Sequence, residues 1–204
     1  MPRSQGNELL GSRIVGGNTA YNRNKSDFYP TPHEVTEALL DFLDLEEGTR
    51  IWEPACGEGH ITSVLKERGY DVVGTDIQTG VDFLKTENAY GAQWIITNPP
   101  FSLAEQFIRK CWGYHIPFAL LLKSQFWNAK KRYDLFRECT PTWVLPLTWR
   151  PDFLFKTRGG GSPLMDVNWC VWSSFGKHMT SYYPLTKREH DEMQMKLFEG
   201  NDDA

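Results

Sequence analysis

Residues 50–76 read RIWEPACGEGHITSVLKERGYDVVGTD, and this stretch decides the fold. Its apolar start predicts a strand. Gly57 and Gly59 predict a tight turn, because glycine adopts positive φ and lets another group approach the backbone closely. Apolar residues at helical spacing then predict a helix from residue 61 to about residue 69, and residues 70–76 predict a second strand that ends in Asp76.

The order of strand, glycine turn, helix, strand and acid is typical of an α/β nucleoside site. The acid lies about 20 residues beyond the glycines, where a carboxylate can accept hydrogen bonds from ribose hydroxyls. The turn has no third glycine and no following Lys-Ser or Lys-Thr. Neither the full dinucleotide fingerprint nor a P-loop is therefore present. Taken alone, the segment also fits a purely structural glycine turn.

A second motif, Asn98-Pro99-Pro100-Phe101, follows the apolar run of residues 94–97. Neither proline carries an N–H, so the corner cannot fold back into a strand ladder. The Asn98 side-chain oxygen and the Pro99 carbonyl can both accept from one amine, and Phe101 offers a flat apolar face. This combination suits a planar ring with an exocyclic NH2, such as an adenine taken out of its stack. The tetrapeptide alone is also an ordinary loop breaker.

With both motifs in this order, the chain resembles the S-adenosylmethionine-dependent DNA adenine-N6 methyltransferases, particularly the small phage-type and orphan bacterial ones. The resemblance covers roughly residues 27–175. It rests on DFYPTPHEV (27–35), EPACGEGHI (53–61), GTDI (74–77), VDFL (81–84) and TNPPF (97–101). It implies an α/β, Rossmann-like class I methyltransferase fold, with a mostly parallel seven-stranded sheet and helices on both faces.

The resemblance also implies a site for S-adenosylmethionine, which would leave as S-adenosylhomocysteine. Asp76 would take the ribose hydroxyls, Asp82 would accept from the cofactor's adenine amine, and Phe83 would pack on the adenine ring. Glu53 is expected to contact the cofactor's amino group, with a structural role under the turn as the alternative. The expected cofactor-binding residues are Tyr29, Thr31, Glu53, Ala55, Cys56, Gly57, Gly59, His60, Ile61, Asp76, Ile77, Asp82, Phe83 and Asn98.

The expected catalytic residues are Asn98, Pro99, Pro100 and Phe101. A flipped adenine would stack on Phe101 while Asn98 and Pro99 accept from its NH2, which aims the nitrogen lone pair at the sulfonium methyl. Transfer would then be direct and in line, assisted mainly by positioning. This chemistry needs no metal ion and no covalent enzyme intermediate.

The net charge of −4 is unevenly distributed. The balance is −7 over residues 1–102, +7 over residues 103–190 and −4 over residues 191–204. A basic region of this kind is typical of a surface that binds a polyanion, and we expect double-stranded DNA as the partner. Solvated helix faces would give the same count.

A stretch between two late predicted strands mixes cations, aromatics and a triglycine. We expect a small DNA-contact insertion here, around residues 147–166, in which Trp149 or Phe153 wedges into a base step. A β-hairpin with a glycine loop is the structural alternative. The expected nucleic-acid-binding residues are Lys123, Lys130, Lys131, Arg132, Trp149, Arg150, Lys156 and Arg158.

The 204 residues predict one methyltransferase domain at residues 27–190, with a mobile arm at 1–26 and an acidic tail at 191–204. Four scattered cysteines without CxxC spacing argue against a zinc site and for a reducing compartment. No apolar run approaches the roughly 18 residues of a membrane span, and no signal peptide opens the chain. We therefore expect a cytoplasmic protein, in a bacterium or a phage-infected host.

Other elements follow from the apolar pattern. Thr31 can N-cap a helix that has Pro32 at its first position. A helix is expected after the Asn98 corner and another at 128–138. Strands are expected at 94–97, 117–123, 142–145 and 168–172.

Two alternatives to DNA adenine methylation stay open. The same corner occurs in enzymes that methylate RNA adenine or protein glutamine, and the basic region does not separate RNA from DNA. The chain is also compatible with a catalytically silent nucleic-acid-binding protein on the same fold. The intact glycine turn, Asp76 and Asn98 favour an enzyme.

Overall fold

The computed structural model describes residues 29–153, 165–176 and 179–187. The predicted arm at 1–26, the predicted tail at 191–204 and most of the predicted insertion lie outside this part of the chain. The described strands are β1 (Arg50–Glu53), β2 (Asp71–Gly74), β3 (Trp94–Thr97), β4 (Phe118–Lys123), β5 (Trp143–Pro146), β6 (Val167–Trp172) and β7 (Ser181–Tyr182). The helices are α2 (His33–Leu43), α3 (His60–Glu67), α4 (Ala104–Tyr114) and α5 (Tyr133–Glu138), with 3-10 turns η1 (Ile77–Thr79), η2 (Phe101–Leu103), η3 (Ser124–Trp127) and η4 (Lys130–Arg132).

The seven strands form one sheet in the order β2-β1-β3-β4-β6-β5-β7. β1 pairs in parallel with β2 and β3, and β3 pairs in parallel with β4. β6 is antiparallel to both β4 and β5, while β7 is parallel to β5. Among the described strands, β6 alone therefore runs against the others. The predicted mostly parallel, seven-stranded sheet is confirmed.

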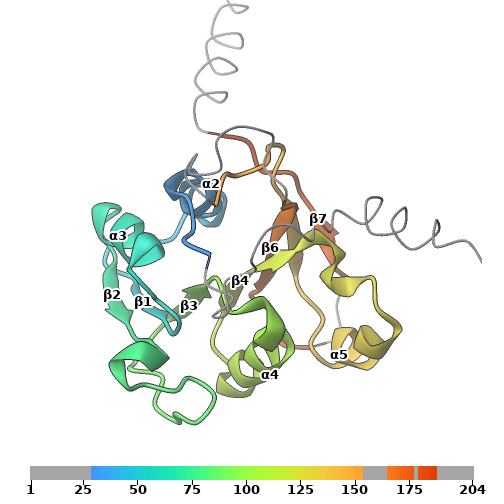
Figure 1. The fold of residues 1–204 in the computed structure, drawn as a ribbon, viewed down its shortest axis with the longest axis horizontal. Coiled ribbons are helices and arrows are strands. Elements are labelled where there is room, and N and C mark those ends of the chain that lie inside the picture. Colours follow the sequence, from blue (N-terminus) through green and yellow to red (C-terminus); the bar gives the residue numbers. More distant parts are fainter. Residues whose placement is uncertain (1–28, 154–164, 177–178, 188–204) are drawn as a thin grey trace, which may run out of the picture.

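Helices cover both faces of the sheet, α2 and α3 on one side and α4 and α5 on the other (Figure 1). Successive side chains of a strand point to opposite faces. Ile51 and Leu121 accordingly pack with α2 and α3, whereas Trp52 and Leu120 pack with α4 and α5. Because both faces of β4 are covered, its sequence is continuously apolar, as is typical of a doubly covered strand.

The direction of winding reverses at β1. β2 lies on one side of β1 and β3 lies on the other, and the connecting helices α3 and α4 lie on opposite faces (Figure 1). Loops that leave the carboxyl ends of β1 and β3 therefore diverge, and in open α/β sheets such a switch point opens a crevice where ligands bind.

The start of α2 corrects one prediction. Thr31 does not cap this helix: Pro32 occupies the N-cap position, and no side chain makes a capping hydrogen bond. The Thr31 hydroxyl oxygen accepts a hydrogen bond from the side chain of Asn98 instead. A contact between residues this far apart in sequence leaves no mark on the local pattern from which a cap is predicted.

Two further differences concern short elements. The helix predicted at 128–138 begins as the 3-10 turn η4 and becomes the α-helix α5 only at Tyr133. The Asn128 N–H donates to the Gln125 carbonyl and ends the preceding turn η3. β7 was not predicted, since two residues are too short for any periodicity.

Candidate functional site

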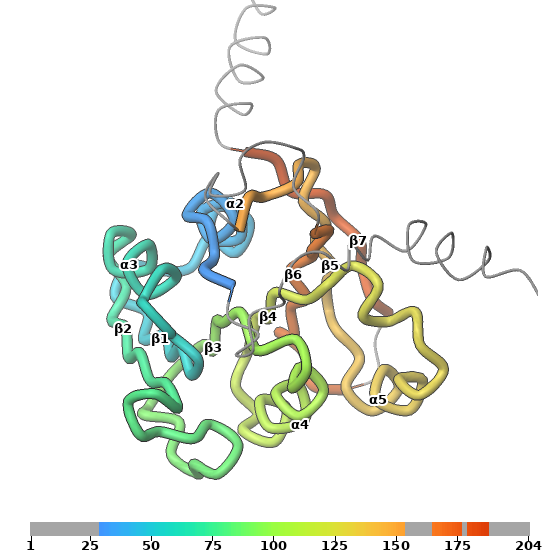
Figure 2. The backbone as a smooth tube through the Cα atoms, in the orientation of Figure 1, coloured from blue at the N-terminus to red at the C-terminus, as the bar shows by residue number. Residues whose placement is uncertain are grey.

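A cleft lies beyond the carboxyl ends of β1, β2 and β3, as expected from the switch point. The segment at residues 29–31, just before α2, forms one wall, beside the end of β3 (Figure 2). The enclosed part measures about 100 Å³, less than the roughly 300 Å³ of a small ligand pocket, so a nucleoside-sized ligand would lie partly in the open. The cleft is lined by Tyr29, Pro30, Thr31, Glu53, Ala55, Cys56, His60, Ile61, Asp76, Ile77, Gln78, Asn98, Pro99 and Pro100.

The glycine turn has the predicted backbone. Gly57 and Gly59 adopt φ values of 48° and 84°, in the region that favours glycine. The Gly57 N–H donates to Asp76 Oδ2 over 2.9 Å, and the Gln78 N–H donates to Asp76 Oδ1 over 2.8 Å. Asp76 therefore fastens the turn after β1 to the turn after β2. Each carboxylate oxygen has a second lone pair left for a ligand.

Glu53 is the buried acid of the cleft. Its residue is only 2% exposed, and the Thr62 hydroxyl donates to its carboxyl group. Burial raises the pKa of Glu53 to about 8, and the nearby charge of Asp76 adds to the increase. A carboxyl held this way becomes an anion readily only when a cation arrives beside it. The site is therefore suited to a positively charged ligand group.

The side chain of Asn98 is held by the segment at residues 29–31, which is distant from it in sequence. Its Nδ2 donates to the Tyr29 carbonyl and to the Thr31 hydroxyl oxygen, each over 3.0 Å. Asn98 Oδ1 is buried and has no hydrogen-bond partner within the described residues. An unpaired buried acceptor costs about 1–3 kcal/mol. A ligand N–H that reached this oxygen would recover that free energy.

Phe101 does not line the cleft but lies next to it. Its ring centroid is 5.6 Å from that of Tyr29, and the Lys123 ammonium lies 4.5 Å from the Phe101 centroid. Tyr29 in turn makes an edge contact with Phe153, which is buried. Phe153 thus belongs to the packing under this corner, and as it stands it is not available to wedge between bases.

Asp82 and Phe83 are not among the residues that line the cleft. Asp82 forms an ion pair with Lys85 at 3.0 Å and accepts from the Leu84 N–H. Phe83 is buried against Trp52 and Phe107 in the core on the α4 side. The contacts expected between these two residues and a cofactor adenine therefore stay a prediction.

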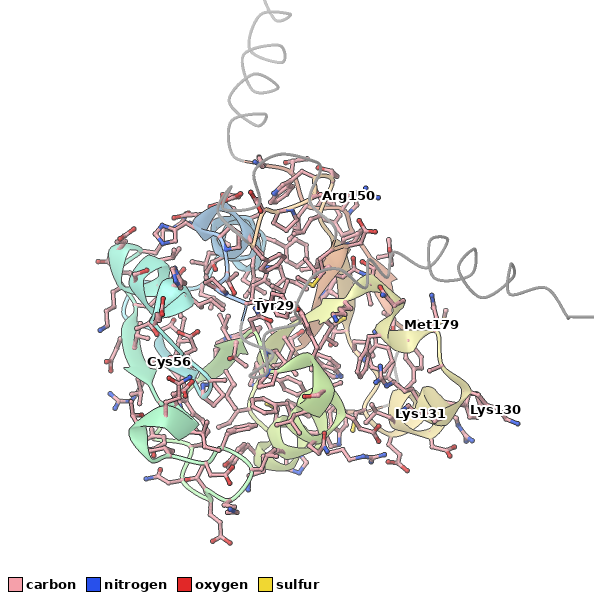
Figure 3. The ribbon with its side chains drawn as sticks, viewed as in Figure 1. Tyr29, Cys56, Lys130, Lys131, Arg150 and Met179 are labelled. Atoms are coloured by element: carbon pink, nitrogen blue, oxygen red, sulfur yellow. The ribbon has the colours of Figure 1, made fainter. Side chains whose placement is uncertain are left out.

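The predicted nucleic-acid residues that the structure describes are found in different parts of the fold. Lys130 and Lys131 lie together beside α5, whereas Arg150 lies well away from them and pairs with Asp166 at 2.7 Å (Figure 3). Arg132 is folded inward: it donates to the Phe126 carbonyl and lies 3.5 Å from the Phe126 ring centroid. Its guanidinium therefore stabilises the chain locally. The predicted residues Lys156 and Arg158 lie outside the described part.

Trp149 lines a second hollow, of about 330 Å³, at the same edge of the sheet. This hollow lies beyond the ends of β4 and β5. Its other lining residues are Ser124, Pro146, Leu147, Asp166, Val167, Asn168 and Tyr182.

Three residues of the site were not predicted. Pro30 and Gln78 line the cleft, and both adjoin predicted residues, so the sequence neighbours were a usable signal. Thr62, which donates to Glu53, lies on α3. No spacing rule connects a threonine inside a helix to an acid at the end of the preceding strand.

The described residues contain no cluster of three or more His, Cys, Asp or Glu side chains arranged to hold a metal ion. None of the described helices combines the length and the apolar composition that a bilayer crossing requires.

No family model matches the sequence, and no curated protein is similar enough to match. Solved structures do match. One is a methyltransferase subunit of a type I restriction-modification system from Streptococcus thermophilus, at 11% identity and a TM-score of 0.53. This alignment covers all of this chain, which spans only 60% of the length of that subunit.

Two further matches are with smaller proteins. One is provisionally described as a class I S-adenosylmethionine-dependent methyltransferase from Listeria monocytogenes (14% identity, TM-score 0.55, covering 95% of this chain and 76% of that one). The other is provisionally described as an RNA methyltransferase from Pyrococcus horikoshii (14% identity, TM-score 0.56, covering 82% and 98%). Together with the sheet, these likenesses establish a Rossmann-like class I methyltransferase fold.

Proposed function

We propose that this protein transfers a methyl group from S-adenosylmethionine to the exocyclic N6 of adenine in DNA. The observation that carries the proposal is the unpaired, buried Oδ1 of Asn98, held beside a cleft at the switch point of a class I methyltransferase fold. That oxygen is placed to accept a hydrogen bond and has none within the described residues. An incoming amine is the kind of group it fits.

The residues of the cleft suit the cofactor. S-adenosylmethionine, when bound, supplies an electrophilic methyl group on a sulfonium. The Glu53 carboxylate would hold its amino group, and Asp76 would accept from its ribose hydroxyls. Ile77 is 70% exposed at the cleft rim, where it offers an apolar surface to the adenine. The asparagine corner would lie next to the methyl group.

The chain's own part in the reaction is to hold the target amine. The Asn98 Oδ1 and the Pro99 carbonyl each accept a hydrogen bond from one N–H of this amine. The nitrogen lone pair is thereby directed at the sulfonium methyl. Phe101 supplies an aromatic face for the base, and such stacking is worth about 1–3 kcal/mol per base. The cation–π contact of Lys123 on that ring is weaker, roughly 0.5–1 kcal/mol at an exposed site. An incoming base can therefore displace it.

Support for DNA comes from the resemblance to adenine-N6 enzymes, and the charge supports a nucleic acid over a protein as the substrate. The balance of +7 over residues 103–190 fits a polyanion. One solved structure of similar fold is a methyltransferase subunit of a type I restriction-modification system. Extruding a base costs a few kcal/mol, which contacts to the flanking phosphates would offset.

The test uses purified protein with tritiated S-adenosylmethionine and three acceptors: unmethylated amplified genomic DNA, total RNA and a protein extract. Label should enter DNA and be recovered as N6-methyladenine. Asn98→Ala should reduce transfer by at least about 10³-fold, as for the loss of a group that positions the reacting atom. Its affinity for the cofactor, measured by calorimetry, should stay within about threefold of the wild type, since Glu53 and Asp76 remain.

If label enters only RNA or only protein, the proposed substrate DNA is wrong and the labelled class is the substrate. Cofactor binding without transfer to any of the three would contradict an enzymatic role and favour a binding protein on the same fold. Loss of cofactor binding in Asn98→Ala, with the fold intact, would show that Asn98 serves the cofactor rather than the amine.

A further inference from the structure

The side-chain amide of Asn98 has one allowed orientation. Both of its N–H groups are used, one by the Tyr29 carbonyl and one by the Thr31 hydroxyl oxygen. A flipped amide would point Oδ1 at the Tyr29 carbonyl, and two acceptors would then face each other without a proton between them. The Tyr29 carbonyl, which can only accept, therefore decides that oxygen, and not nitrogen, is left for a ligand, and the Thr31 hydroxyl holds the second N–H in place.

The same short segment organises the rest of the corner. Tyr29, Pro30 and Thr31 all line the cleft, and the Tyr29 ring packs against Phe101. The segment includes Pro30 and is followed by Pro32, so its φ angles are restricted at two positions. Thr31 is only 3% exposed. A stiff strip, half-buried at Tyr29 and Pro30 and buried at Thr31, thus lies against both the expected cofactor site and Asn98.

Among the residues that the structure describes, Asn98 is the hydrogen-bond partner of the buried Thr31 hydroxyl, and no other partner explains its burial. It does not cap α2, because no side chain does. Its oxygen is the acceptor for Asn98. A valine at this position would keep nearly the same shape and lose that acceptor, so the amide would have one N–H without a partner and would be held only by its bond to the Tyr29 carbonyl.

We propose that Thr31 is a positioning residue for methyl transfer: its hydroxyl holds the Asn98 amide so that Oδ1 faces the target amine. This inference rests on the proposed function and deepens it. It assigns to Thr31 a role toward the acceptor amine, in place of the cofactor contact implied by the resemblance. It also makes the 29–31 segment a link between the two substrates.

The test compares Thr31→Val, Thr31→Ser and a matched control, Thr36→Val. Thr36 is fully buried on α2, and its hydroxyl has no partner within the described residues, so its replacement should leave transfer unchanged. Thr31→Val should lower kcat by roughly 10- to 100-fold, the scale of a small misplacement of a reacting group. Its dissociation constant for S-adenosylmethionine should change by less than about threefold. Thr31→Ser keeps the hydroxyl and should recover most of the lost rate.

A second readout does not depend on activity or on the cofactor. The Asn98 side-chain NH2 gives a pair of amide signals in nitrogen-15 NMR spectra, assigned by their absence in Asn98→Ala. Because both protons are hydrogen-bonded within a buried corner, their exchange with solvent should be slow in the wild type, Thr31→Ser and Thr36→Val. In Thr31→Val at least one proton should exchange at least about tenfold faster.

The outcomes separate the two proposals. If the wild type transfers no methyl group to any acceptor, the proposed function fails, while the amide signals still show whether Thr31 holds Asn98. Unchanged amide exchange in Thr31→Val would overturn the inference. So would weakened cofactor binding with an unchanged kcat, because Thr31 would then serve the cofactor.

Discussion

The proposed binding of the cofactor's amino group depends most on the protonation state of Glu53. It lies at the end of β1, almost fully buried, with the Thr62 hydroxyl on one carboxyl oxygen. Burial raises its pKa to about 8, so near pH 7 the carboxyl is mostly protonated when no cation is near. Binding of an ammonium group would favour the anion and lower this pKa.

The first prediction concerns cofactor affinity and pH. Below the raised pKa, the ionised fraction of Glu53 grows about tenfold per pH unit. Affinity for S-adenosylmethionine should therefore rise from pH 6.5 toward pH 8 by up to about tenfold per unit and level off above it. Glu53→Gln should bind more weakly, with no such rise. Calorimetry across this range measures both, and parallel profiles for the two proteins would contradict a contact with the cofactor's amino group.

The second prediction concerns stability and holds whatever the protein does. An unfolded Glu releases its proton near 4.5, whereas folded Glu53 keeps it to about pH 8. Between these values the native state binds more protons, so the free energy of unfolding falls as pH rises, by at most about 1.4 kcal/mol per unit. Chemical denaturation at pH 5, 6.5 and 8 should show this fall in the wild type relative to Glu53→Gln. A constant difference between the two proteins would mean that Glu53 ionises normally.

At the scale of elements, the end of β4 brings a cation to the asparagine corner. β4 pairs with β3, so the Lys123 that ends β4 lies over the Phe101 that begins η2. This contact follows from strand order, which places the two carboxyl ends side by side. We infer that Lys123 also attracts the phosphates around a target base.

A third prediction follows from that placement. Lys123→Ala should weaken binding to duplex DNA and reduce the slope of log K against log salt by about one, as for the loss of one phosphate contact. Lys85→Ala is the matched control, because Lys85 is exposed and pairs with Asp82 away from the cleft. Fluorescence anisotropy between 50 and 200 mM salt gives both slopes. Equal slopes for the two variants would mean that Lys123 does not contact DNA phosphates.

The elements also show what sequence can and cannot predict. β1, α3, β2, β3 and β4 were predicted because each has a strong apolar period and is bounded by Gly or Pro. The predicted N-cap of α2 was wrong, and α5 is shorter than the predicted helix. At α2 a long-range contact decided the cap, because the Thr31 hydroxyl accepts from Asn98. At α5 a short-range hydrogen bond decided the boundary, because the Asn128 N–H donates to the Gln125 carbonyl and closes η3.

At the scale of the whole molecule, the cleft is assembled from segments that the sheet order brings together. The turns after β1, β2 and β3 were predicted to carry the site, and their residues do line one cleft. The sequence could not show that Asp76 fastens the glycine turn, that Thr31 holds Asn98, or that Phe83 points into the core. Each is a contact across the fold, fixed by packing and not by spacing.

Charge is the other property of the whole molecule. The surplus of cations lies in residues 103–190, yet Arg150 lies well away from the neighbouring Lys130 and Lys131 in the fold (Figure 3). A duplex lying across the carboxyl edge of the sheet would contact such separated cations through phosphates of different turns. Specificity would then rest on few base contacts and on the residues near the second hollow, including Trp149.

The most direct test of the central claim is modified-base sequencing of DNA from cells that express the protein, against the same cells expressing Asn98→Ala. N6-methyladenine is expected in the wild-type sample alone, in a defined sequence context that would give the recognition site. DNA free of the new mark, from cells in which the wild-type protein is folded and binds S-adenosylmethionine, would contradict it.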